Sequence, residues 1–91
     1  MAEIRVLQTN GFLRAYKRLN NNQKDAVDGA VATIVSDPSR GDAKQGNLSG
    51  VFVYKFDCVN QRFLLAYEFD ASKRVLLLVG NHENFYRNLK R

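Results

Sequence analysis

The side chains best suited to chemistry stand near the end of the chain. His82 is the only histidine, and it follows an apolar run that ends at Gly80 and Asn81, with Tyr86 four residues further on. An imidazole has an ordinary pKa near ~6.5, so His82 is the side chain most ready to move protons at neutral pH. A lone histidine is also a common surface or structural residue, and both interpretations remain open at this point.

Two basic residues, Lys55 and Arg62, lie in neighbouring expected strands. If the aromatic residues of both strands share one face, the numbers of two directly paired residues must sum to an odd value such as 117. This pairing sets Lys55 opposite Arg62 and leaves a four-residue loop, Asp57 to Asn60, between the strands. Like charges in opposite positions destabilise a sheet by roughly a few tenths of a kcal/mol unless an anion lies between them. This register predicts an anion site. The alternative is that both side chains extend into solvent or pair with Glu68 or Asp57.

The other basic side chains of interest gather in two places. Arg14, Lys17 and Arg18 lie on the polar side of an expected helix, and Arg40 and Lys44 lie in a loop. Lys and Arg number 14 against 9 for Asp and Glu, which gives a net charge of +5. This balance favours an anionic partner, either nucleic acid or an acidic protein segment, over a membrane surface. A basic surface that serves only solubility is the alternative.

The elements that must position these side chains follow from the spacing of apolar residues. We expect a strand over 3–8, a helix from Asn10 as N-cap to Leu19, a second helix ended by Pro38, a surface loop over 39–49, strands over 51–57, 61–70 and 74–81, and a short helix or frayed tail over 83–91. Two helices joined by three asparagines form a hairpin whose apolar stripe must lie on a sheet. The sequence thus predicts an α+β fold of order β-α-α-β-β-β(-α), with the helical hairpin packed on a small antiparallel sheet.

Alternation along the strands assigns the core. The aromatic faces of 51–57 and 61–70 are expected to point inward, whereas Lys55 and Arg62 lie on the opposite faces. The strand over 74–81 is apolar on both faces and is therefore expected to be central or covered on both sides.

Length and composition exclude several classes of protein. The chain has 91 residues, 45% of them apolar and 25% charged, which fits one globular domain over 1–91. No apolar run approaches the ~20 residues of a membrane span, and the first ten residues lack a signal-peptide pattern, so we expect a soluble, cytoplasmic protein without a membrane partner. A single cysteine, Cys58, and a single histidine exclude an internal disulfide or a zinc site, and we expect neither metal nor cofactor.

Four sequence segments together resemble one family. They are Asp37-Pro38, Leu48-Ser49-Gly50, the run from Gln61 to Tyr67, and the run from Val79 to Tyr86. Their order and spacing resemble the RelE/ParE superfamily of bacterial toxin–antitoxin toxins over nearly the whole chain. Gly80, His82 and Tyr86 are similar to the Gly-x-His-x-x-x-Phe ending of the YafQ-like nucleases, so the RelE/YafQ-like branch of mRNA interferases is the closest match.

The resemblance implies a toxin of a type II toxin–antitoxin system. The RelE-like branch cuts mRNA in the ribosomal A site without metal, by attack of a 2′-OH on its own 3′ phosphate. For this chain the resemblance implies a reaction site of His82, Tyr86, Arg62 and Lys55. The YafQ-like enzymes use further histidines, so a two-histidine relay is impossible here.

The same resemblance implies the partners. Arg14, Lys17, Arg18, Arg40 and Lys44 would grip ribosomal RNA phosphates, and an antitoxin encoded alongside would lay an acidic or amphipathic segment across the basic face. The ParE-like branch instead poisons DNA gyrase without known hydrolytic activity, and it is the alternative. An inactive family member that acts only in an antitoxin complex is a further one.

Overall fold

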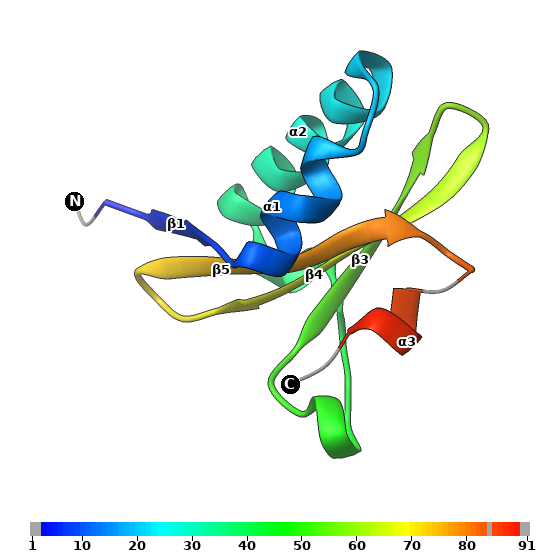
Figure 1. Ribbon diagram of the computed structural model, residues 1–91. Coiled ribbons are helices and arrows are strands. Elements are labelled where there is room, and N and C mark those ends of the chain that lie inside the picture. The colour runs from blue at the N-terminus through cyan, green and yellow to red at the C-terminus, as the bar shows by residue number, and fades with distance from the viewer. Residues whose placement is uncertain (1–2, 84, 90–91) are drawn as a thin grey trace.

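The computed structural model describes residues 3–83 and 85–89. Its elements follow the predicted order, and the α+β fold is confirmed (Figure 1). They are β1 (Arg5–Gln8), α1 (Asn10–Lys17), α2 (Asn21–Ser36), a 3₁₀ helix (Pro38–Arg40), β2 (Asp42–Ala43), a second 3₁₀ helix (Gly46–Leu48), β3 (Phe52–Cys58), β4 (Gln61–Phe69), β5 (Lys73–Asn81) and α3 (Phe85–Asn88). No helix of the described residues is long and apolar enough to cross a membrane.

The sheet has five strands in the order β1-β5-β4-β3-β2. Strands β2 to β5 pair antiparallel, as expected, whereas β1 pairs parallel with β5, so the sheet is mixed. The prediction of a purely antiparallel sheet was incomplete because the helical hairpin carries the chain from one edge of the sheet to the other. Strand β2 is two residues long and lies in the segment expected to be loop.

Both long helices begin at side-chain caps. The Oγ1 of Thr9 accepts a hydrogen bond from the Phe12 N–H at 3.1 Å, so Thr9, not Asn10, is the N-cap of α1. Asn20 caps α2 in a capping box, in which its side chain accepts from the Gln23 N–H and the Gln23 side chain accepts from the Asn20 N–H. Helix α2 ends at Ser36, ahead of Pro38, in agreement with the expected stop.

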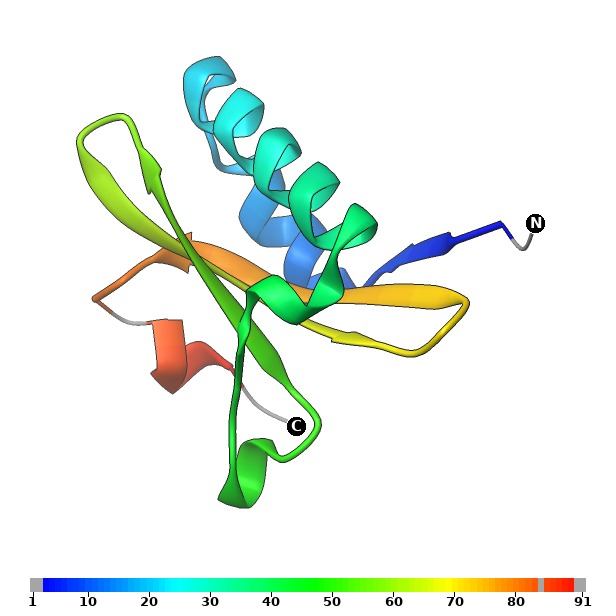
Figure 2. The same ribbon diagram turned by 180° about the vertical axis from the view of Figure 1, so that it is seen from behind.

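Both faces of the sheet are covered. The α1–α2 hairpin covers one face, where Phe63, Leu65 and Tyr67 pack with Phe12 and Ile34, so the aromatic core was predicted correctly. Helix α3 covers the other face, as the two views in Figures 1 and 2 show. There Phe85 of α3 and Leu89, the residue after the helix, pack against four residues of β3, β4 and the segment before β3, namely Val51, Val53, Leu64 and Ala66. This second small core was not predicted. Strand β5 contributes to both clusters, as expected for a strand covered on both sides.

The predicted register of β3 and β4 was wrong. Paired residue numbers sum to 119, so Lys55 lies opposite Leu64, and Arg62 lies opposite Asp57. The turn contains two residues instead of four: Val59 and Asn60, with φ angles of 49° and 66°. Two consecutive positive φ angles are typical of the tight two-residue hairpin turn, whose twist matches that of the strands.

A buried tyrosine holds the segment between α2 and β3 in place. The Tyr67 side chain is fully buried, and its hydroxyl donates to the Pro38 carbonyl at 2.5 Å and accepts from the Gly41 N–H at 3.0 Å. Burial raises the pKa of this phenol, which keeps the hydroxyl protonated and able to donate. Tyr67 thus fixes the start of the segment that carries Arg40 and Lys44.

Candidate active site

The end of the sheet brings together two of the residues predicted to react. Phe63 and Asn81 form the last pair of the β4–β5 ladder, and Arg62 and His82 occupy the next step on the two chains. The side chains of both Arg62 and His82 are exposed. An imidazole and a guanidinium therefore stand at one end of the molecule, open to a large ligand.

Arg62 forms an ion pair instead of facing Lys55. Its Nε lies 3.1 Å from the Asp57 Oδ1, and the two side chains are 55% and 87% exposed. The alternative in which Arg62 pairs with Asp57 is therefore the observed one. An ion pair this exposed contributes at most about 1 kcal/mol, so Arg62 can exchange Asp57 for a phosphate at little cost.

Lys55 lies two residue pairs further into the sheet than Arg62. Its partner Leu64 is itself paired with Gly80, so the three residues form a row across β3, β4 and β5. Because directly paired residues project to the same side, Lys55 and Arg62 share the face that α3 covers. A Cβ atom added at Gly80 would meet nothing within 4 Å, so the row leaves open space near the end of β5.

Helix α3 places Tyr86 on the same face. Phe85 is buried and anchors the helix, while Tyr86 next to it is 41% exposed. The Lys44 Nζ lies 5.4 Å from the centre of the Tyr86 ring, a cation–π contact. Sequence reasoning had assigned Lys44 to ribosome binding, and no local signal links two residues 42 positions apart. The structure thus adds Lys44 to the surroundings of Tyr86.

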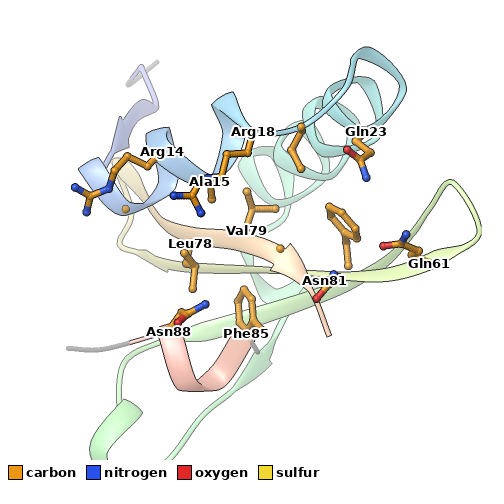
Figure 3. A pocket seen from close by; sticks show the side chains of 14 residues that line it. Arg14, Ala15, Arg18, Gln23, Gln61, Leu78, Val79, Asn81, Phe85 and Asn88 are labelled. Atoms are coloured by element: carbon orange, nitrogen blue, oxygen red, sulfur yellow. The ribbon is translucent and has the colours of Figure 1, made fainter. Parts of the chain in front are cut away.

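The remaining predicted basic residues lie elsewhere. Arg14 and Lys17 are exposed on α1, which packs on the opposite face, and Arg18 is exposed at its C-cap. Arg40 is exposed in the first 3₁₀ helix. Arg14 and Arg18 line a groove of about 670 Å³ between α1 and α3 at the edge of β5 (Figure 3). Within residues 3–83 and 85–89, no group of three His, Cys, Asp or Glu residues is arranged to hold a metal ion.

Solved structures with a similar fold are bacterial toxins. The chain is similar to the RelBE2 toxin–antitoxin complex of Mycobacterium tuberculosis, with 21% identity and a TM-score of 0.74 over 89% of this chain and 100% of that one. It is also similar to a mutant of the Escherichia coli toxin RelE in the free state, with 14% identity and a TM-score of 0.72 over 98% and 95% of the two chains. A third similar structure is the intact E. coli RelBE toxin–antitoxin complex, with 15% identity, a TM-score of 0.68 and coverage of 88% and 98%. These likenesses establish a RelE-like fold.

A family model described as a ParE-like toxin of type II bacterial toxin-antitoxin systems matches residues 6–90. The chain therefore belongs to this family and is a toxin of the RelE/ParE superfamily. No curated protein sequence matches the chain significantly.

Proposed function

We propose that this toxin is a ribosome-dependent mRNA endonuclease of the RelE kind, neutralised by a cognate antitoxin. The observation that carries the proposal is the adjacent placement of Arg62 and His82 at the end of the β4–β5 ladder, on a sheet whose α3 face also carries Lys55. Tyr86, with Lys44 against its ring, adds an aromatic surface on α3. The toxin would act in the cytoplasm, where translating ribosomes are found.

The proposed reaction needs no metal. The 2′-OH of a nucleotide attacks the adjacent 3′ phosphorus, the bond from phosphorus to the 5′ oxygen of the next nucleotide breaks, and the products are a 2′,3′-cyclic phosphate and a free 5′-OH. One proton leaves the 2′-OH and one reaches the departing 5′ oxygen, and His82 is the residue able to carry out one of these transfers. Arg62 and Lys55 would stabilise the negative charge that grows on the phosphate oxygens. Tyr86 would stack on an unpaired base.

The ribosome would supply the remaining positioning. Few catalytic groups are available, so the rate depends on a substrate held in an attack geometry, and free RNA should be a poor substrate. Arg14, Lys17, Arg18, Arg40 and Lys44 would contact ribosomal RNA phosphates, since phosphate contacts dominate such binding and are sequence-independent.

The test is to express the chain briefly in cells and to map the 5′ ends of mRNA. We expect cuts at regular positions within translated codons, and we expect His82→Ala to reduce them at least ~100-fold, the usual size of a lost acid or base. Because His82 is exposed, the variant should unfold at the same temperature as the parent chain. Lys73→Gln is the matched control, since it removes an exposed charge at the opposite end of β5.

DNA gyrase is the second candidate target. It is favoured by the description of the matching family, ParE-like toxin. The resemblance to the ParE-like branch implies a gyrase poison without known hydrolytic activity. A supercoiling assay with purified gyrase separates the two functions. Inhibited supercoiling together with intact mRNA would overturn the nuclease and assign the chain to gyrase.

A further inference from the structure

We propose that Gly80 is a contact position for the substrate, at which the reacting ribose and phosphate of the RNA lie directly against the backbone of β5. The inference rests on the nuclease activity proposed above and adds a residue that this activity requires. A larger side chain at position 80 would occupy the space of the reacting nucleotide.

Folding does not explain the glycine at position 80. Gly80 lies near the end of β5, paired with Leu64, and its φ angle is not positive, so other residues could adopt the same backbone. A Cβ atom added there would meet no atom within 4 Å in the part of the chain that the structure describes. A glycine inside a strand weakens the strand, because it loses the most freedom on folding and packs no side chain. Such a glycine often marks a place where a ligand approaches the backbone closely.

Other glycines of the chain differ from Gly80 in this respect. Gly46 has a φ of 66°, and a Cβ atom added at Gly41 would collide with the Tyr67 hydroxyl, so both positions have a structural reason for glycine. Gly29 has open space around it, as Gly80 has, but it is exposed on α2, on the other side of the sheet from α3. Gly29 is therefore a matched control for Gly80.

Gly80 lies beside the residues proposed to react. His82 follows it by two residues, so their Cα atoms are at most about 7 Å apart. An acid or base must come within about 2.6–3.2 Å of the oxygen whose proton it moves. Arg62 lies two residues along β4 from Leu64, the partner of Gly80, so Arg62 and Gly80 share the face that α3 covers. A nucleotide held between His82 and Arg62 must therefore pass close to residue 80.

The space at Gly80 is open to a large ligand. Gly80 lines the groove of about 670 Å³ together with Asn81 and Phe85, whose side chains Figure 3 shows near the end of β5. Strand β1 pairs with β5 only from Lys73 to Leu76, so no strand of the described residues covers the outer edge of β5 at Gly80. Backbone N–H groups donate to phosphate oxygens in many nucleic-acid complexes. The lack of a side chain at position 80 lets a phosphate approach this edge closely.

The first test is a series of side-chain sizes at position 80, measured as mRNA cleavage on purified translating ribosomes. We expect Gly80→Ala to lower the rate roughly tenfold and Gly80→Val about 100-fold, since a displacement near 1 Å can cost this much. Urea unfolding should show no loss of stability in either variant, because the new side chains enter open space and replace a strand glycine. Gly29→Ala should leave cleavage unchanged.

A second measurement tests the contact without the cleavage reaction. The full chain, labelled with ¹⁵N, is titrated by NMR with hexauridine, which should stay intact without ribosomes. We expect the Gly80 amide signal to shift, and we expect Gly80→Val to bind hexauridine at least ~tenfold more weakly, a change of about 1.4 kcal/mol. Gly29→Ala should bind it as the parent chain does.

The two measurements separate this inference from the proposed function. Equal cleavage by Gly80→Val and the parent chain would overturn the inference while the nuclease stands. A loss of stability in Gly80→Val, or no shift at Gly80 with millimolar hexauridine, would overturn it as well. A parent chain that cuts no mRNA but binds hexauridine at Gly80 would overturn the nuclease and support the RNA contact at this position.

Discussion

At the scale of single residues, the contact between Gly41 and Tyr67 decides how the segment after α2 is held. A Cβ atom added at Gly41 would collide with the Tyr67 hydroxyl. That hydroxyl is buried and bonded to Pro38 and Gly41, so it has no room to move away without breaking both bonds. The segment that carries Lys44 can therefore follow its observed path only because residue 41 is a glycine.

Gly41→Ala should therefore destabilise the protein by about 1–3 kcal/mol, the range for a disturbed buried hydrogen bond. Gly29→Ala is the matched control. Gly29 lies inside α2, and a Cβ atom there would meet nothing within 4 Å, so alanine should stabilise the helix by about 0.5–1 kcal/mol. Urea unfolding measures both free energies. Equal effects of the two substitutions would show that the clash with Tyr67 does not constrain the fold.

The site residues were predictable to different degrees. His82 was placed correctly at the end of a strand because the apolar run of that strand stops at Gly80 and Asn81. The ion pair of Arg62 with Asp57 depends on the register of β3 and β4, and the contact of Lys44 with Tyr86 joins residues that are far apart in the sequence. Residue types alone predict neither of these two contacts.

At the scale of elements, the β3–β4 hairpin contains a strained turn. Val59 has a φ of 49°, a region that β-branched residues strongly disfavour, and its side chain is 52% exposed. Substitution by asparagine, which tolerates this region, should stabilise the protein by about 1 kcal/mol with no loss of packing. Thermal or urea unfolding of Val59→Asn measures the gain.

Val6→Asn provides the comparison for this substitution. Val6 is also largely exposed, at 39%, but it lies in β1 without a positive φ, so asparagine should bring no gain there. A similar stability of Val59→Asn and the parent chain would show that the turn carries no strain at this position.

The same turn explains the wrong register. Periodicity of two fixes which residues share a face, but only the loop length fixes which residues are paired. Valine is a poor residue for a positive φ, so the residue types do not indicate the two-residue turn that forms. The cover that α3 gives to the second face was missed for a related reason. Phe85 and Leu89 form too short an apolar pattern to indicate what they pack against.

At the scale of the whole molecule, the sheet separates the basic residues into two groups. Arg14, Lys17 and Arg18 lie with the helical hairpin, whereas Lys44, Lys55 and Arg62 lie on the side of α3. If the second group surrounds the scissile phosphate, the first group must contact a different part of the ribosome or the antitoxin. The basic residues that give the chain its net charge of +5 would then form two surfaces, each with its own anionic partner.

Ribosome binding should therefore depend on salt, and the helical hairpin should contribute separately from the reaction site. The inactive His82→Ala toxin should lose affinity for ribosomes as KCl rises, and each lost phosphate contact should lower the log–log slope by about 0.7–0.9. Lys17→Gln should produce one such decrease, because its exposed ammonium has no acidic partner among the described residues. Lys73→Gln should leave the slope unchanged, since the Lys73 Nζ lies 3.9 Å from the Asp70 Oδ2 at the far end of β5. An unchanged slope for Lys17→Gln would mean that α1 does not contact ribosomal RNA, and its arginines would then serve the antitoxin alone.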